Sequence, residues 1–171
     1  MTGTTAGRPG LLNAEDLALI DRGVSTIVAS HDASRRPSLM RAVGAAITPD
    51  GERITVYLNR PASNQLLANL QATGHIAVVF SEPFSHRAVQ VKAGAVELRP
   101  AAAHDAPILA RYLASMETEL GRIGIDPEYT RIMLTHQLDN VVAVSFSPEQ
   151  AFDQTPGPKA GASLPSAGAM A

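Results

Sequence analysis

The sequence predicts an α+β fold that is mainly β: a small antiparallel barrel of about six strands, with about four helices on its outside. Three observations favour this fold. Short runs of β-branched residues recur along the chain, tight turns join the first three of these runs, and four other segments show helical spacing or helix-capping residues. Strands joined by short turns pair in antiparallel fashion, and closing a sheet into a barrel removes its exposed edges.

The first half of the chain holds three of the predicted strands. Val24 to Ser30 is short and β-branched, and two alternating runs follow, Leu39 to Ile47 and Ile54 to Leu58. The turn Thr48-Pro49-Asp50-Gly51 separates these two runs. Within the first alternating run we expect a single face to carry Leu39, Arg41, Val43, Ala45 and Ile47.

The remaining strands are predicted at His75 to Ser81, Arg87 to Leu98 and Val141 to Phe146. In the long run, the apolar positions change parity between its two ends. We therefore expect a β-bulge near Ala93-Gly94, where one extra residue would restore the alternation.

Three of the four predicted helices begin at residues typical of helix starts. Asn13 opens a short helix with an acidic residue three positions later, and Ser63 opens another that ends at Gly74. A long amphipathic helix follows from about Ala106. Asp126-Pro127 gives the last helix its N-cap and its first helical residue.

The composition changes at both ends of the chain. We predict a flexible N-terminus over residues 1–12, one domain over 13–152, and a Pro/Gly/Ala-rich tail over 153–171. The stiff Pro156-Gly157-Pro158 segment has two interpretations, either part of a disordered tail or a cover over a pocket.

The overall composition excludes several classes of function. The 171 residues carry a net charge of -2, which argues against a nucleic-acid partner bound through bulk charge. Cysteine is absent, which removes disulfides, thiolate metal sites and cysteine nucleophiles. No apolar run approaches the roughly 20 residues that span a membrane, and the first residues lack the apolar core of a signal peptide. We therefore expect a cytoplasmic protein without a membrane partner.

No self-contained catalytic motif is present. The chain has no phosphate-binding glycine loop and no metalloprotease or hydrolase signature, and its five histidines lie too far apart in sequence to predict a metal site. If the protein is an enzyme, we expect an organic cofactor to supply the chemistry.

The order of these segments resembles the pyridoxamine 5′-phosphate oxidase-like flavoproteins. The resemblance rests on a strand with Arg41, an Asp-Gly turn, a strand ending near Tyr57, a helix with paired leucines, and a strand with Arg87 and Gln90. It covers roughly residues 24–98 and implies the FMN-binding split β-barrel fold, in a homodimer with FMN bound between the subunits.

The resemblance also implies roles for individual residues. Arg41 matches the arginine that helps to hold the FMN phosphate, and Arg87 and Gln90 match positions that reach the flavin from the partner subunit. Asn64 stands where the family usually has a lysine, which weakens the expected phosphate site. The third strand, its loop and the following helix start supply the other implied contacts: Val56, Tyr57, Leu58, Asn59, Ser63 and Asn64.

Several of these residues could instead have purely structural roles, without any contact to a ligand. Arg41 could form an internal salt bridge, Tyr57 could simply pack at a strand end, and Ser63 and Asn64 could only cap a helix. The expected function is a flavin-dependent oxidoreductase acting on a small molecule. The alternative is a dimer that binds or senses a flavin or haem without catalysis.

Overall fold

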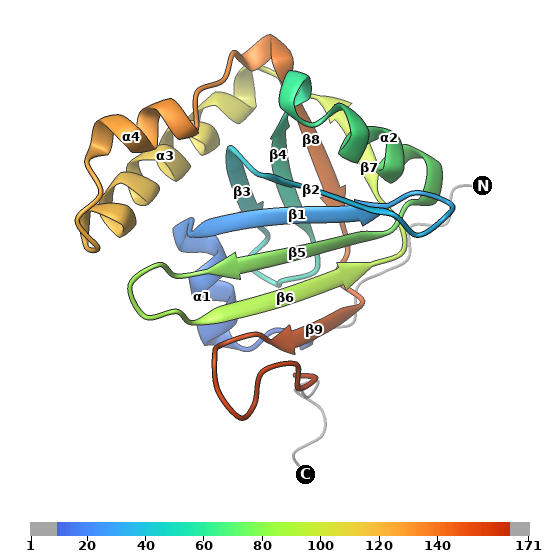
Figure 1. Cartoon of the computed structure of the whole chain (residues 1–171), viewed down its shortest axis with the longest axis horizontal. Helices are drawn as coiled ribbons and strands as arrows, with labels where there is room; N and C mark the ends of the chain where they lie inside the picture. Colours follow the sequence, from blue (N-terminus) through green and yellow to red (C-terminus); the bar gives the residue numbers. More distant parts are fainter. Residues whose placement is uncertain (1–9, 165–171) are drawn as a thin grey trace.

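The computed structural model describes residues 10–164. Parts of the predicted flexible N-terminus and of the predicted tail, residues 1–9 and 165–171, lie outside the described residues. Four α-helices and nine strands follow one another along the described chain (Figure 1). The helices are α1 (Ala14–Arg22), α2 (Asn64–Thr73), α3 (Ala106–Gly121) and α4 (Pro127–Met133). The strands are β1 (Ser25–His31), β2 (Pro37–Arg41), β3 (Gly44–Ile47), β4 (Ile54–Asn59), β5 (Ile76–Ser81), β6 (Ala88–Ala93), β7 (Glu97–Pro100), β8 (Val141–Phe146) and β9 (Gln150–Asp153).

The nine strands form two antiparallel sheets. One sheet has five strands in the order β2-β1-β5-β6-β9, and the other has four in the order β3-β4-β8-β7. The inner faces of both sheets contribute to one apolar core, in which Val28, Val78 and Val91 from the first sheet join Val56 and Val144 from the second. The fold is α+β, as predicted, and within residues 10–164 the strands pair as two sheets rather than as one closed barrel.

The alternating run from Leu39 to Ile47 is not one strand, and that prediction was wrong. The backbone N–H of Ala42 donates to Thr26 in the first sheet, and the next residue, Val43, donates to Tyr57 in the second. The chain thus passes from one sheet to the other between β2 and β3. Because of this break, Leu39 and Arg41 lie on the opposite side from the buried Val43, and the predicted common face does not exist.

The long run from Arg87 to Leu98 is also divided. The parity change near Ala93-Gly94 is real, but it marks the end of β6 in the first sheet, and β7 then begins in the second sheet at Glu97. The predicted bulge is thus a change of sheet. The short strand β9 has no counterpart in the predicted set, and it closes the first sheet by pairing with β6.

The predicted helix signals at Asn13, Gly74 and Asp126 are confirmed. Asn13 accepts hydrogen bonds from the backbone of Glu15 and Asp16, each over 2.9 Å, and so caps α1. Gly74 ends α2 in the left-handed conformation, and Asp126 caps α4. Figure 1 shows α3 and α4 together at one side of the sheets and α2 at the other. Of the helices within residues 10–164, none has both the length and the apolar character needed to cross a membrane.

The chain after β9 folds back on that strand. Gly161 and Leu164 donate backbone hydrogen bonds to Asp153 and Ala151, over 2.7 and 2.9 Å. Residues 155–164 therefore lie along the edge of the five-stranded sheet. This places Pro156 on the wall of a surface cavity, together with Gln90 and Gln154.

Candidate functional site

The strand register gathers two of the predicted site residues on the outer face of the five-stranded sheet. Successive cross-strand partners place Arg41, Ile27, Val79, Gln90 and Phe152 in one row, from β2 through β1, β5 and β6 to β9. With neighbouring strands about 4.8 Å apart, Arg41 and Gln90 lie about 14 Å from each other along this row. Residues separated by almost 50 positions in sequence thus share one surface.

A cavity of about 700 Å³ lies over the Arg41 end of this face. Arg41, Ser25 and Ser81 contribute the side of the cavity that belongs to the sheet. The other wall comes from the end of α3, the following loop and α4. Its main apolar side chains are Leu120, Ile125, Tyr129 and Met133. A mostly apolar cavity of this size with a few polar groups is typical of small-molecule sites.

The guanidinium of Arg41 is the only arginine or lysine head group in this cavity. It is half-buried, and its Nη1 donates to Ser25 Oγ over 2.8 Å. Within residues 10–164 no carboxylate lies within 4.0 Å of it, whereas eight other arginines of the same residues have such a partner. The internal salt bridge considered for Arg41 is therefore absent from the described residues. Arg41 keeps donors for an external anion.

Thr130 of α4 is a second polar group with spare hydrogen-bonding capacity. Its side chain is fully buried and lines the cavity, and its Oγ1 has no hydrogen-bond partner among residues 10–164. A buried hydroxyl left without a partner costs about 1–3 kcal/mol.

The rim of this cavity is unusually apolar for a surface. Tyr129 is 71% exposed, Met133 41% and Ile125 38%. Exposed apolar side chains gathered around a cavity mark surfaces that bind a ligand or another chain.

A smaller cavity of about 440 Å³ adjoins the first one. The two share Ser81 and Pro83, and the smaller one contains the predicted residue Gln90. Gln90 Oε1 accepts a hydrogen bond from Gln154 Nε2 over 3.3 Å. Together the two cavities form a continuous depression along one end of the outer face.

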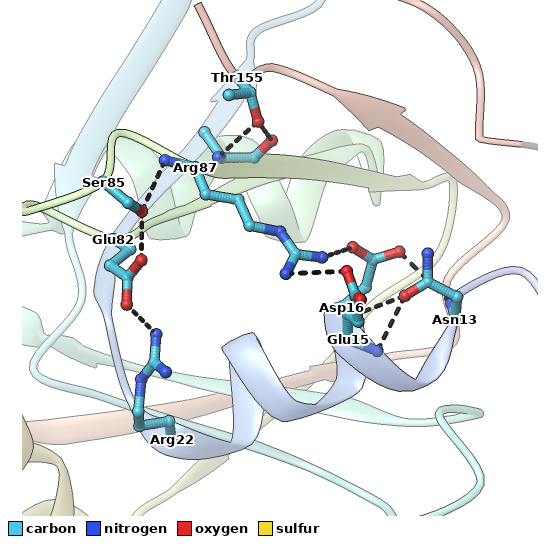
Figure 2. Close-up of polar contacts among 9 residues, drawn as sticks. Asn13, Glu15, Asp16, Arg22, Glu82, Ser85, Arg87 and Thr155 are labelled. Carbon is cyan, nitrogen blue, oxygen red and sulfur yellow. Dashed lines mark hydrogen bonds and ion pairs between the residues drawn. The ribbon is translucent and has the colours of Figure 1, made fainter.

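Arg87, in contrast, is held in ion pairs within the chain (Figure 2). Its Nη2 lies 2.8 Å from Asp16 Oδ1, and its Nη1 lies 3.4 Å from Glu15 Oε2. Asp16 is almost completely buried and also belongs to the capping box of α1. Arg87 therefore fastens α1 to the start of β6, and in this chain its charge is already neutralised.

The strand residues Val56, Tyr57 and Leu58 place their side chains in the core, each 0 or 1% exposed. The Tyr57 hydroxyl donates to Asp105 Oδ1 over 2.8 Å, and Arg99 donates to both Asp105 oxygens over 2.7 and 2.8 Å. The hydrogen bonds from Arg99 hold the pKa of Asp105 well below its usual range. Burial, together with Asp105, raises the pKa of Tyr57. Only the backbone of these three strand residues remains for contact with a ligand.

The residues predicted around the start of α2 lie in a different place from Arg41. Asn59 Nδ2 donates to Thr135 O over 3.2 Å. Ser63 is buried at the N-cap, yet its hydroxyl has no partner among the described residues. Asn64 is exposed and lines a third cavity, of about 320 Å³, together with Arg60 and Arg99. The cavity that contains Arg41 contains neither Ser63 nor Asn64.

Several residues of the main cavity were missing from the predicted set. Ser25 and Ser81 are cross-strand partners, although 56 positions separate them, and Thr130 and Tyr129 come from a helix that was predicted without any site residue. Serines at strand ends carry no signal in a single sequence. Only the pairing of β1 with β5 brings them beside Arg41.

The chain is similar to known proteins in its structure but not in its sequence. No family model matches the chain, and no curated protein matches its sequence. A provisionally assigned pyridoxamine 5′-phosphate oxidase from Lactobacillus delbrueckii aligns over 84% of this chain and 94% of its own, at 16% identity and a TM-score of 0.53. HupZ from Group A Streptococcus aligns over 88% of this chain and 99% of its own, at 17% identity and a TM-score of 0.53. An F420 reductase aligns over 78% and 93%, at 16% identity and a TM-score of 0.54. The chain therefore has the fold of these proteins, and the expected split-barrel architecture is confirmed.

Proposed function

We propose that this chain, with the split-barrel fold of pyridoxamine 5′-phosphate oxidase-like proteins, binds FMN or a related phosphate-bearing flavin in the Arg41 cavity. We further propose that it acts as a flavin-dependent oxidoreductase on a small substrate. The observation that supports the proposal most is Arg41 itself, a half-buried cation without a carboxylate partner in the described chain, on the wall of an apolar cavity. Such a combination of a cation that has no carboxylate partner with a mostly apolar cavity suits a ligand that joins an anionic group to a flat ring.

The residues of this cavity fit a flavin phosphate better than the other predicted residues do. Arg41 would hold the phosphate, with the hydroxyls of Ser25 and Ser81 beside it and the partnerless Thr130 hydroxyl as a further donor. The apolar side chains of α4 would cover the ring and exclude water. When bound, the flavin would supply hydride exchange with the substrate.

The oligomeric state belongs to the same proposal. Along the outer face of the five-stranded sheet, Ile27, Ala29, Ala77 and Val79 are half-buried and Leu39 is 63% exposed. A sheet that is apolar on both faces is normally covered on both. A second copy of the chain is the occupant that we propose, because it would place the depression beside Arg41 and Gln90 at the border of a subunit interface.

Binding of FMN can be tested directly on the purified protein. We expect its visible absorption spectrum to show a flavin, which mass spectrometry identifies after release by denaturation. If the protein is isolated empty, added FMN should lose its fluorescence on binding. A colourless protein that leaves FMN fluorescence unchanged contradicts the proposal.

Two variants locate the phosphate. Arg41→Gln should weaken FMN binding by about ten- to a hundredfold, because it removes a charge-assisted hydrogen bond. Arg53→Gln, which removes an exposed arginine paired with Glu97, is the matched control and should bind as the wild type does. If Arg60→Gln weakens binding and Arg41→Gln does not, the phosphate lies at the start of α2 instead.

Catalysis is a separate measurement. Reduction of the bound flavin by NADH or NADPH and its reoxidation by oxygen would support an oxidoreductase. A flavin that binds tightly but exchanges no electrons with either donor would favour the alternative, a dimer that carries or senses its ligand.

A further inference from the structure

A cavity of about 530 Å³ lies at the opposite end of β1 from Arg41. Ser25, at the first position of β1, lines the Arg41 cavity, whereas His31, at the last position, lines this one. Six residue steps along a strand separate the two by about 20 Å. The walls also include the β1–β2 turn, the start of β5, the end of β6 and the turn before β9.

Two histidines stack in this cavity. The ring centroids of His31 and His75 lie 5.1 Å apart, with 27° between the ring planes. His31 Nδ1 lies 2.9 Å from the carbonyl oxygen of Asp32, and a carbonyl only accepts, so Nδ1 carries the hydrogen and Nε2 is left for another partner. The His75 ring has no hydrogen bond within residues 10–164. Both rings therefore have nitrogen atoms available to a ligand.

Two basic side chains, Arg35 and Lys92, line the same cavity. Neither Arg35 nor Lys92 has a carboxylate within 4.0 Å in the described part of the chain, although most arginines there do. The Lys92 ammonium lies 4.8 Å from the centre of the Phe152 ring. Glu149 is the one acidic residue among the lining residues. The cavity thus has an excess of positive charge and of hydrogen-bond donors.

We propose that this cavity is a second ligand site, which binds a small molecule through a phosphate group. A phosphate monoester is mostly a dianion at neutral pH, and it accepts several hydrogen bonds at once. Arg35 and Lys92 offset part of that charge, and the two imidazoles supply further donors when protonated. The apolar residues Ala29, Ile76, Ala77 and Ala93 leave room for an organic group on the phosphate.

The proposal does not depend on the flavin site. The two cavities share none of their lining residues and lie at opposite ends of β1. This cavity is at the margin of the outer face, where β1 turns into β2, so a dimer formed through Ile27 and Val79 would border it.

Nuclear magnetic resonance of the imidazoles tests the proposal on the intact chain. Long-range proton–nitrogen spectra should show saturable shifts of His31 and His75 as inorganic phosphate is added at constant pH. Sodium chloride at the same ionic strength should cause no such shifts, and the exposed His104 should respond to neither salt. A parallel titration with phenyl phosphate distinguishes a phosphate ester from free phosphate as the ligand. If phenyl phosphate binds more tightly than inorganic phosphate, the ligand is an ester; if the two bind equally, it is free phosphate.

Charge-removing variants show whether the site is specific. Lys92→Met and Arg35→Gln should each weaken phosphate binding by about tenfold. Lys159→Met, which removes another lysine without a carboxylate partner in residues 10–164, is the matched control and should have no effect. Arg41→Gln should leave the histidine shifts unchanged although it weakens FMN binding, so the two proposals can fail separately. Shifts that do not saturate, or an equal loss in Lys159→Met, would overturn the second site.

Discussion

Among the charged side chains of this protein, the informative ones are those that lack an opposite charge. Eight arginines of residues 10–164 pair with carboxylates, and these pairs join elements of the fold. Arg41, Arg35 and Lys92 do not, and each of them lines a cavity. Arg41 and Lys92 are half-buried, and a partly buried charge without a partner loses solvation and gains nothing in return, so these two residues point to ligands.

Asp105 illustrates the opposite case, a charge that serves stability. The carboxylate is 1% exposed and accepts hydrogen bonds from Arg99, Tyr57 and the backbone of Ala102. Asp105→Asn should lower the free energy of unfolding by about 1–3 kcal/mol at neutral pH, because Arg99 loses its partner and the buried amide satisfies fewer donors. Chemical denaturation measures this difference.

The same residue predicts a pH dependence. The pKa of Asp105 is lower in the folded chain than in the unfolded one. Its contribution is therefore complete above the unfolded value, about 4, and is lost as the pH falls through the folded value. The difference in stability between the wild type and Asp105→Asn should shrink as the pH falls below about 4. A difference that stays constant down to acid unfolding would contradict this account.

At the level of elements, the place where β3 meets α3 has no spare volume. A Cβ added at Gly44 would lie 2.6 Å from Leu109 Cδ2 on α3 and 3.1 Å from Tyr57 Cδ2. Gly44→Ala should destabilise the protein by about 1–3 kcal/mol, because the buried Leu109 side chain must shift within a packed core. Gly121→Ala is the control within α3: nothing lies within 4 Å of its added methyl group, and the free energy of unfolding should stay the same or rise slightly. Thermal unfolding of both variants tests the pair.

The attachment of α1 gives a second prediction at this scale. Arg87→Gln leaves the buried carboxylate of Asp16 without its nearest cation. Since Arg87 is itself one third exposed, we expect a loss of only about 1–2 kcal/mol of stability. FMN affinity should be nearly unchanged, because this guanidinium is already occupied within the chain. A large loss of FMN affinity at unchanged stability would instead assign Arg87 to the flavin, as the family resemblance implies.

For the whole molecule, the decisive property is how the outer face of the five-stranded sheet is covered. Val79 lies at the centre of that face, between Ile27 and Gln90. Val79→Lys should convert the proposed dimer to a monomer, because it places a charge in an apolar interface. Sedimentation velocity measures the mass, and Thr55→Lys on the other sheet serves as the control that should stay dimeric. A wild-type protein that sediments as a monomer would rule out the proposed interface.

The sequence by itself determined the fold class, the helix ends and most of the strands. These are local properties: Asn13, Gly74 and Asp126 cap helices through atoms a few residues away, and alternation shows which residues can share a strand. The resemblance to split-barrel proteins also came from the order of such local segments.

Only the tertiary structure decided which of the predicted site residues share a surface. The sequence alone cannot show that the chain changes sheets after Arg41 and again near Gly94. The alternation continues unbroken through the first crossing, and the parity change at the second equally suits a β-bulge. It also cannot show that Arg87 pairs with Asp16 or that Tyr57 donates a hydrogen bond to Asp105. Nor can it show that Ser25 and Ser81 lie beside Arg41. These contacts depend on strand register and helix docking, which many weak interactions far apart in the chain fix together.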